Sequence, residues 1–403
     1  MDFDTLDELV VPADSTIVLL VLDGVGGLGR QTHGPTELEA AETPMLDDLA
    51  AESVCGLQLP VGPGISPGSG PGHLGLFGYD PLDFRVGRGV LSALGIDFDL
   101  QPGDVAARGN FCTVEDGVVT DRRAGRISTE ANCRLTELLD DIELPGADVL
   151  VRTVKEHRFL LVLRGDDLDG DVSDTDPHEV GRPPQNPRAR SPRAERTADL
   201  IETFVDRARD RLGDVRNDTP ANMVLMRGFD QRPDWPRFPT HYGLDAACIA
   251  NYPMYRGVSR LVGMQTLDAP SSIGDKFDLV GDHVDDFDFF FVHEKRTDSL
   301  GEDGDFEAKV DVLEEVDSAL PRLLDADPDV VMVTGDHSTP AAMKRHSWHP
   351  VPVLLNADNA RADGVEAFGE SACRAGELGP QFRAADLMPL ALANAGRLTK
   401  FGA

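Results

Sequence analysis

Three segments of the chain carry residues whose types could do chemistry together. Asp23 ends the apolar run STIVLLVLDG, Ser69 lies in the glycine-rich segment PGSGPGHLGLFGYDP, and Asp336 and His337 follow the run DVVMVTG. A serine in such a turn can act as a nucleophile, while carboxylates and imidazoles at the ends of buried strands can hold metal ions. The combination predicts phosphoryl transfer through a phosphoserine beside two metal ions.

The position of Ser69 is open to two interpretations. His73 and Leu74 begin a predicted helix, and its N-terminus would offer free backbone N–H groups and the positive end of the helix dipole to a phosphate. A serine at that place could also be an N-cap with a purely structural role. The glycines between residues 64 and 75 are poor helix formers, so their presence favours the functional interpretation.

Two further segments could complete a metal site. Asp298, in HEKRTDSLGED, follows an aromatic strand, and His346, in RHSWHPVP, precedes the next buried run, with His349 as an alternative. A mixed set of oxygen and nitrogen ligands without cysteine suits Mn, Mg or Zn better than a metal that prefers thiolate. Any one of these residues alone would more often be structural or solvated, so the prediction rests on their shared position at strand ends.

Basic residues gather in the middle of the chain, against an acidic background. Clustered arginines could bind a carboxylate and a phosphate bidentately, although they could equally balance nearby surface acids. Asp176, in DTDPHEVG, could be a general acid or base, or simply a turn former. The candidate substrate-binding residues in this part of the chain are Arg122, Arg123, Arg126, His157, Arg158 and Arg227.

Short apolar runs that end in a polar residue indicate the elements that would position these side chains. This alternation of buried runs and amphipathic stretches predicts an α/β fold with helices on both faces of a sheet. Ligands of such sheets bind at the carboxyl ends of strands, where Asp23, Asp298 and Asp336 fall. We expect parallel strands at 16–22, 246–250, 287–293, 329–334 and 351–355, and helices at 43–53 and 308–326.

The middle of the chain has a different pattern. From about residue 97 to 237, alternation of apolar and polar residues predicts an antiparallel α+β unit. Within it, the Pro/Arg-rich stretch 181–196 should be an exposed loop, and a second breaker-rich stretch at 230–239 precedes the return of the first pattern. We therefore expect one α/β domain, formed by 1–96 and 238–403, with a second domain inserted at 97–237.

The composition limits the cellular environments and the binding partners that suit this protein. The 403 residues include 71 acidic and 38 basic side chains, for a net charge of −33. Such a surface repels itself unless salt screens it, which favours a salt-adapted cytoplasm over an ordinary one and argues against nucleic acid or an anionic membrane as partner. Five scattered cysteines without CxxC spacing indicate free thiols in a reducing compartment. The acidic N-terminus and the lack of an apolar run of ~20 residues predict a cytoplasmic protein, with its oligomeric state open.

The sequence closely resembles the archaeal type of cofactor-independent (2,3-bisphosphoglycerate-independent) phosphoglycerate mutase, a branch of the alkaline phosphatase superfamily. The resemblance implies an alkaline-phosphatase-like sheet domain that binds two divalent ions, Mn or Mg with Zn as an alternative, and an inserted α+β domain that binds phosphoglycerate. The matching segments run in order along nearly the whole chain and are VLDGVGG, TPMLDDLA, PGSGPGHLGLFGYDP, GRGVLSALG, TDRRAGRIST, DPHEVGRPP, YGLDAACIANYPMYRGVSRLVGM, TGDHSTP, HSWHPVP and KFGA.

The resemblance also implies roles for particular residues. Ser69 matches the serine that is phosphorylated and that contacts a metal ion. Family residues that bind substrate fall in the segments that hold Arg122, Arg123, Arg126 and Arg227 here. The matching metal ligands are Asp23, Asp336 and His337 for the ion on the serine side, and Asp298 and His346 for the other ion.

The sequence departs from the family pattern at three places. Glu302 stands where the family usually has a histidine; it could still bind a metal, favouring Mg or Mn over Zn, or Asp303 or Asp305 could take its place. The segment PGSGPGH replaces PGSDTAH, which removes a carboxylate near Ser69. Arg256 stands where a lysine is often found, so a substrate-binding residue there keeps its charge and changes its geometry.

The leading hypothesis is the interconversion of 3-phosphoglycerate and 2-phosphoglycerate in glycolysis and gluconeogenesis, with Ser69 as nucleophile and Asp176 or His157 as proton carrier. A second hypothesis is a phosphohydrolase, or a mutase of another small phosphate ester. A third is a non-catalytic relative that binds phosphometabolites. Release of free phosphate would indicate the second, and binding of fewer than two ions per chain would indicate the third.

Overall fold

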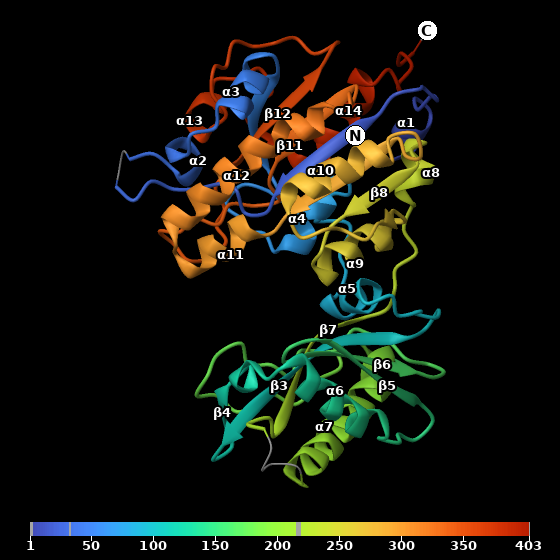
Figure 1. Ribbon diagram of the computed structural model, residues 1–403. Coiled ribbons are helices and arrows are strands. Elements are labelled where there is room, and N and C mark those ends of the chain that lie inside the picture. Colours follow the sequence, from blue (N-terminus) through green and yellow to red (C-terminus); the bar gives the residue numbers. More distant parts are fainter. Residues whose placement is uncertain (1–2, 32–33, 215–218, 403) are drawn as a thin grey trace. The chain divides into compact units, whose positions relative to one another are not determined.

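The computed structural model describes residues 3–31, 34–214 and 219–402. The chain divides into two compact units. Unit 1 consists of Met1–Arg85 and Pro236–Ala403, and unit 2 of Val86–Trp235 (Figure 1). Among the described residues, no helix is both long enough and apolar enough to cross a membrane.

Unit 1 is built on a mostly parallel eight-stranded sheet, in the order β13-β2-β12-β11-β1-β10-β8-β9 (Figure 1). Strand β1 lies at its centre and pairs in parallel with both β10 and β11. Every residue of β1 is buried, because helices cover both faces of the sheet, and this explains its uninterrupted apolar sequence. The strands are β1 (Ile17–Leu22), β2 (Val54–Leu59), β8 (Ala246–Ile249), β9 (Gln265–Thr266), β10 (Phe289–Glu294), β11 (Val330–Thr334), β12 (Val351–Ala357) and β13 (Gly379–Arg383).

Helices pack on both faces of this sheet, as predicted. On one face, Leu46, Phe277 and Leu313 from α3, α10 and α12 join the core of the sheet. On the other, the ring of Phe77 at the end of α4 lies 5.0 Å from that of Phe291 in β10. The helices of unit 1 are α1 (Phe3–Asp7), α2 (Glu37–Ala40), α3 (Pro44–Ala51), α4 (Ser69–Leu76), α8 (Phe238–Tyr242), α9 (Pro253–Val262), α10 (Ile273–Asp282), α11 (Arg296–Asp303), α12 (Phe306–Leu324), α13 (Glu370–Cys373) and α14 (Leu387–Asn394), with a 3₁₀ turn at Ala384–Asp386.

One strand direction differs from the prediction. All five predicted strands are present, but β12 pairs antiparallel with both β11 and β2. Residues 335–350, which join β11 to β12, form no helix that would carry the chain back across the sheet. Without such a crossover two consecutive strands run antiparallel, so the prediction of a parallel strand at 351–355 was wrong.

Unit 2 is an antiparallel α+β unit, as predicted. Its sheet has the order β4-β3-β6-β5, and β7 also pairs with β3. Helices α6 and α7 cover one face and enclose the apolar core of the unit (Figure 1). The elements are α5 (Arg88–Gly95), β3 (Val105–Glu115), β4 (Val118–Asp121), α6 (Thr129–Asp140), β5 (Asp148–Lys155), β6 (Arg158–Arg164), α7 (Glu195–Asp214) and β7 (Met223–Asp230), with 3₁₀ turns at Ala124–Arg126 and Pro192–Ala194.

The first boundary between the units lies earlier than the predicted 96/97. Helix α5 belongs to unit 2, because its glycines let it approach the sheet closely: a Cβ on Gly89 would lie 2.1 Å from the backbone oxygen of Ala106 in β3. The backbone N–H of Gly87 also donates to Asp230 at the end of β7, at 2.6 Å. The second boundary, at Trp235/Pro236, lies two residues before the predicted one.

Candidate active site

The ends of two neighbouring strands bring the first group of predicted ligands together. Strands β1 and β11 run parallel, so the residues that follow them lie at the same edge of the sheet. Asp23 follows β1 directly, and Asp336 and His337 come shortly after β11; all three side chains are fully buried. The Nε2 atom of His337 lies 3.3 Å from Asp23 Oδ1 and 3.2 Å from Asp336 Oδ2.

This group of atoms fits a divalent cation. Asp23 Oδ1 and Asp336 Oδ2 are buried and accept no hydrogen bond, although His73 Nδ1 lies 3.1 Å from Asp336 Oδ2. A buried carboxylate oxygen without a partner is costly, and a cation between the two would offset that cost. Burial lowers the pKa of His337, so its imidazole is neutral and can offer a lone pair to an ion.

A second group shares His337 with the first. Asp298, His337 and His346 have ligand atoms close enough to hold one ion. His346 Nε2 lies 3.5 Å from Asp298 Oδ1, and its ring stacks on that of His337 with centroids 3.7 Å apart. His349 instead bonds Ser347 Oγ through Nδ1 at 2.9 Å. The structure therefore favours His346 over His349.

Asp298 and Glu302 both lie on α11, but they differ in burial. Asp298 is buried, three residues into the helix rather than at the strand end itself. Glu302 is 56% exposed, and its Oε1 lies 3.8 Å from His346 Nε2. Asp305, which could take the place of Glu302 as a metal ligand, caps α12 by accepting from the backbone N–H of Ala308. Metal ligation by Glu302 stays a prediction.

Ser69 is the first residue of α4, and Gly68 is the N-cap. The serine side chain is therefore not the N-cap of the helix. Its Oγ lies 3.3 Å from His337 Nε2, which places it beside the first ligand group. Helix α4 packs tightly on the loop that follows β11, since a Cβ on Gly72 would lie 2.2 Å from the backbone oxygen of Asp336. This arrangement suits a nucleophile better than an N-cap.

Lys295 brings a positive charge into the site that we did not predict. Its Nζ lies 3.1 Å from Asp23 Oδ2 and contacts Asp298 Oδ2. Burial alone would lower the pKa of Lys295, but the two carboxylates outweigh burial and raise it, so the ammonium stays charged. The signal available in the sequence was a lysine three residues before Asp298 in HEKRTD.

Two aromatic side chains also reach Asp23. The Tyr255 hydroxyl donates to Asp23 Oδ2, and His293 Nε2 lies 3.2 Å from the same oxygen. Tyr255 and His293 are buried, in α9 and at the end of β10. Burial would raise the pKa of Asp23, but Lys295 and His293 outweigh it, and the pKa lies well below its usual range.

Asp176 is the centre of the predicted cluster in unit 2. It is 1% exposed, and Arg122 binds it bidentately, at 3.0 Å from Nε to Oδ1 and 2.7 Å from Nη2 to Oδ2. Arg227 Nε lies 3.4 Å from Oδ2. Burial alone would raise the pKa of Asp176, but the hydrogen bonds from Arg122 and from the backbone of His178 lower it. The carboxylate is thus held as an anion that orients two guanidinium groups.

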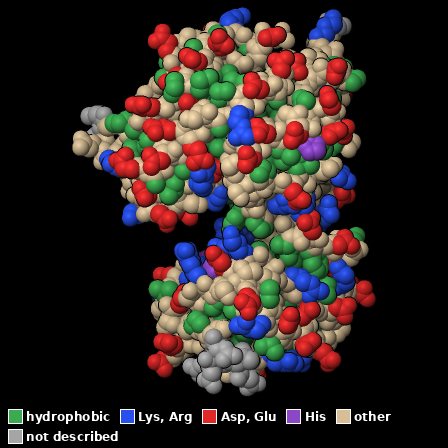
Figure 2. Space-filling view, in the orientation of Figure 1, with side chains coloured by type: hydrophobic (Ala, Val, Ile, Leu, Met, Phe, Trp, Pro, Cys, Tyr) green, Lys and Arg blue, Asp and Glu red, His purple; other side chains and the backbone are tan. Residues whose placement is uncertain are grey.

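His157 lies in a strongly positive environment. The side chain is 2% exposed, and burial, followed by the charges of four arginines, lowers its pKa to about 3. Figure 2 shows several Lys and Arg side chains close to a histidine on one part of the visible face of unit 2, while over the rest Lys and Arg are mixed with Asp and Glu. The four arginines that act on His157 are Arg158, Arg123, Arg108 and Arg126.

Arg108 joins this cluster although we did not predict it. It lies on β3 directly opposite Arg227 of β7, on the sheet face away from α6 and α7. Two residues further on, Asn110 lies opposite Arg158 of β6, and its buried Oδ1 has no partner. The signal was an arginine and an asparagine at alternate positions of the apolar segment ARGNF. Arg256, in contrast, belongs to unit 1, where its Nη1 donates to the backbone of Leu267 at 3.0 Å.

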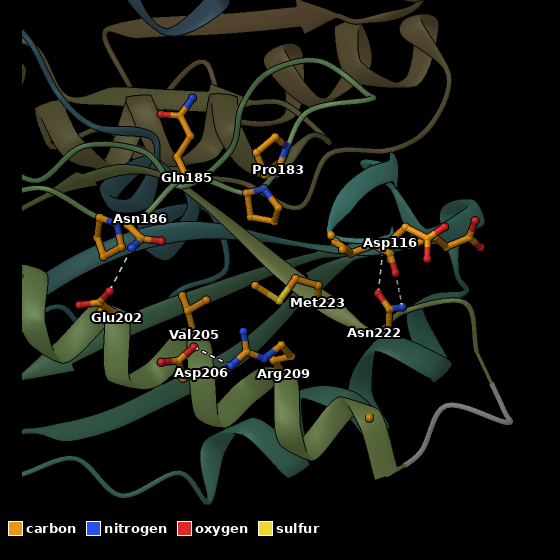
Figure 3. A pocket seen from close by; sticks show the side chains of 16 residues that line it. Asp116, Pro183, Gln185, Asn186, Glu202, Val205, Asp206, Arg209, Asn222 and Met223 are labelled. Atoms are coloured by element: carbon orange, nitrogen blue, oxygen red, sulfur yellow. Dashed lines mark hydrogen bonds and ion pairs between the residues drawn. The ribbon is translucent and has the colours of Figure 1, made fainter.

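A cavity of about 890 Å³ in unit 2 contains none of the predicted site residues (Figure 3). Side chains of α7 line one side of it, and the loop around Pro183 lies across from them. Three of its charged side chains have partners in the lining, since Glu202 accepts from Asn186 at 3.2 Å and Arg209 donates to Asp206 at 2.9 Å. Nothing in this lining indicates a particular ligand.

An α/β sheet domain with a serine beside buried carboxylates and imidazoles, interrupted by an antiparallel unit rich in arginine, is typical of enzymes that transfer phosphoryl groups at metal ions. A family model for 2,3-bisphosphoglycerate-independent phosphoglycerate mutase matches residues 50–217. The chain belongs to this family, because full-length relatives share nearly half of its residues.

The relatives include probable 2,3-bisphosphoglycerate-independent phosphoglycerate mutases from two bacteria. One from Thermus thermophilus is 49% identical, over 100% of this chain and 99% of its own. That of Aquifex aeolicus is 46% identical, over 99% and 100%. The family therefore extends beyond archaea, and membership does not assign this chain to an archaeal source.

Two solved structures share the fold over nearly the full length. A protein from Pyrococcus horikoshii is 30% identical with a TM-score of 0.83, covering 96% of this chain and 99% of its own. The cofactor-independent phosphoglycerate mutase from Thermoplasma acidophilum is 32% identical with a TM-score of 0.69, covering 94% and 100%.

Proposed function

We propose that this protein interconverts 3-phosphoglycerate and 2-phosphoglycerate, without 2,3-bisphosphoglycerate, through a phosphoserine at Ser69. The observation that carries the proposal is the Ser69 hydroxyl, 3.3 Å from His337 Nε2 and beside two buried carboxylates that each have one oxygen without a hydrogen bond. The names of the full-length relatives support the choice of substrate.

Two divalent ions would occupy the two ligand groups of unit 1. Oxygen and nitrogen donors without thiolate favour Mn or Mg, with Zn as an alternative. When bound, such ions supply positive charge that lowers the pKa of a hydroxyl and stabilises the transferring phosphoryl group. The residues that would hold them are Asp23, Asp336 and His337 for one ion and Asp298 and His346 for the other, with Ser69 and Glu302 as further ligands.

The reaction requires two transfers through one side chain. Ser69 Oγ attacks phosphorus, an O–P bond to serine forms, and the O–P bond to glycerate breaks. The proton of the serine hydroxyl passes to the glycerate oxygen. The phosphoryl group then returns to the other hydroxyl of glycerate, which restores Ser69. The charge of Lys295, held between Asp23 and Asp298, offsets part of the negative charge of the transferring group.

The arginines of unit 2 would bind the anionic groups of the substrate. Arg122 and Arg227 are oriented by Asp176, and bidentate guanidinium contacts suit a carboxylate or a phosphate. Arg123, Arg126 and Arg158 add positive charge around His157. Because Asp176 is held as an anion by arginine, orientation of these groups is a better-supported role for it than proton transfer. Arg256 as a substrate contact remains a proposal.

A coupled assay in concentrated KCl with Mn²⁺ and 3-phosphoglycerate, and without bisphosphoglycerate, tests the proposal. Wild type should form 2-phosphoglycerate without releasing phosphate, and Ser69→Ala should lose at least about a thousandfold in kcat. Ser272→Ala, which removes the exposed N-cap of α10, is the matched control and should keep its activity. Full activity of Ser69→Ala would refute the covalent route, and release of phosphate by wild type would indicate a phosphohydrolase.

We also propose that the protein works in the cytoplasm of a cell with high internal salt. The net charge of −33 supports the high internal salt, because repulsion among so many acidic side chains is tolerable when salt screens it. The five cysteines are free thiols in the structure, which supports a reducing compartment.

A further inference from the structure

Thr339 lies between the two ligand groups and contacts one residue of each. Its Oγ1 is 2.7 Å from Asp298 Oδ1 and 2.9 Å from His337 Nδ1. The side chain is fully buried. The sequence gives no sign of this hydroxyl's position, because it depends on how the loops after β1 and β11 pack.

The single proton of the hydroxyl determines the direction of both contacts. Asp298 contacts the Lys295 ammonium through Oδ2, and an ionised carboxylate can only accept hydrogen bonds. The Thr339 hydroxyl therefore donates to Asp298 Oδ1 and accepts from the Nδ1–H of His337. Because a neutral imidazole carries one proton, Nε2 of His337 keeps its lone pair. Nε2 is the atom of His337 that faces the oxygens of the first ligand group.

Two glycines make room for Thr339 and limit its movement. Gly24 has φ of +64°, and a Cβ there would lie 2.6 Å from Thr339 Oγ1 and 3.0 Å from Asp298 Cβ. A Cβ on Gly301 would lie 3.0 Å from Thr339 Cγ2. The hydroxyl and the methyl group thus each occupy a close-fitting space, and β-branching restricts the side chain to that rotamer.

We propose that Thr339 is a positioning residue that couples the two ion sites, by fixing the tautomer of His337 and the orientation of Asp298 through one hydroxyl. This inference rests on the proposed function in assuming that both ligand groups bind ions. Outer-shell partners of metal ligands typically contribute about 10- to 100-fold to metal affinity. Loss of this hydroxyl should therefore weaken both ions together.

Calorimetric titration of the metal-free protein with Mn²⁺ tests the coupling. Thr339→Val keeps the shape and removes the hydroxyl, and it should weaken binding of both ions by about 10- to 100-fold. Thr339→Ser keeps the hydroxyl and should bind both ions nearly as tightly as wild type. Thr136→Val in unit 2 is the matched control, because its buried hydroxyl bonds the backbone oxygen of Cys133 and no ion ligand. It should bind Mn²⁺ like wild type.

Several outcomes would overturn the inference. Unchanged Mn²⁺ affinity in Thr339→Val would do so, as would weakening of one ion alone. If Thr339→Ser were as weak as Thr339→Val, the hydroxyl would not be the cause. A wild type that binds only one ion would also overturn it, whatever its activity. A wild type that binds two ions without converting phosphoglycerate would remove the proposed function and leave this inference standing.

A second measurement needs no variant at Thr339. Nitrogen NMR of metal-free wild type with ¹⁵N-labelled histidine reports which ring nitrogen carries the proton, and His337→Gln assigns the signal. The inference predicts a proton on Nδ1 of His337. A proton on Nε2 would overturn it even if Thr339→Val failed to fold.

Discussion

At the scale of single residues, the candidate site is centred on the imidazole of His337. Its Nε2 lies 3.3 Å from Asp23 Oδ1, 3.2 Å from Asp336 Oδ2 and 3.3 Å from Ser69 Oγ. Its ring stacks on that of His346, which belongs to the second group. Because His337 contacts the ligands of one group through Nε2 and stacks on His346 of the other, a substitution at His337 should disturb both groups.

In unit 2, Asp176→Asn should weaken substrate binding more than it slows turnover. The amide cannot accept two bonds from Arg122 and hold it as an anion does, so the guanidinium groups lose their orientation. Hydrogen bonds to charged groups contribute about 1.5–3 kcal/mol, so KM for 3-phosphoglycerate should rise about tenfold or more. Steady-state kinetics across pH provides the measurement.

The pH profile separates this positioning role from proton transfer. If Asp176 only orients Arg122, the shape of kcat against pH should be the same in Asp176→Asn and wild type. A collapse of kcat together with loss of one limb of the profile would identify Asp176 as the proton carrier instead. Asp174→Asn is a suitable control, since Asp174 also lies near Arg227 but accepts from the backbone N–H of Gly228.

The sequence predicted the ligand types but not the residues that connect them. Asp23, Asp298 and Asp336 follow buried strands, which is a local signal. Lys295 and Thr339 were missed because their importance comes from contacts made across the fold, as between Thr339 and Asp298. The choice of His346 over His349 likewise depended on where the loop before β12 turns, which spacing alone does not define.

At the scale of elements, helix α12 braces the loops that carry the ligands. Its Lys309 is fully buried, and the Nζ donates to the backbone oxygens of Gly24, at 2.9 Å, and Thr339, at 3.0 Å. The buried carboxylates Glu37 and Glu370 lie near enough to act on its charge. One helix thus ties the loop after β1 to the loop after β11.

Lys309→Met should destabilise unit 1 strongly. The substitution keeps an apolar stem, but it removes the Lys309 donor from the carbonyls of Gly24 and Thr339 and leaves two buried acids without a positive neighbour. The carbonyl of Gly24 still accepts from the backbone N–H of Thr339. Breaking a buried charge network of this kind costs about 3–5 kcal/mol in unfolding free energy, measurable by urea denaturation. Lys155→Met, at an exposed lysine of β5, should change stability by less than about 0.5 kcal/mol. Equal stability of the two variants would contradict the bracing role.

Element types were more predictable than element directions. The runs that became β1, β10 and β11 are apolar on both faces, and that pattern is specific to strands covered on both sides. The antiparallel direction of β12 has no such signal, because a strand buried on both faces reads the same in either direction. The prediction placed helix α5 in the wrong unit for a similar reason. Gly89 allows the helix to pack closely against Ala106 of β3, and the sequence alone does not show that these two residues are neighbours.

At the scale of the whole molecule, the acidic surface should make stability depend on salt. With a net charge of −33, mutual repulsion opposes the compact state, and KCl screens it. The thermal midpoint of unfolding, followed by circular dichroism, should rise steeply as KCl increases from about 0.1 to 1 M, where the Debye length falls from about 10 to 3 Å.

A non-ionic osmolyte provides the control for this salt effect. Sucrose favours burial of surface without screening charge, so it should raise the midpoint without reproducing the steep rise at low KCl. A midpoint that is flat in KCl would contradict the interpretation of the charge, and with it the proposal of a high-salt cytoplasm.

The interruption of unit 1 by unit 2 has a consequence for the order in which the protein is assembled during synthesis. Unit 2 is continuous in the chain and is complete once Trp235 has left the ribosome. Strand β1, made first, has neither neighbour until residues 289–294 and 330–334 follow. Domains generally fold as units while the chain emerges, so the arginine cluster forms early, whereas Asp23 must wait for Asp336. Until then β1 is an apolar segment with two unpaired edges, and this is the stage at which the nascent chain is most exposed to aggregation.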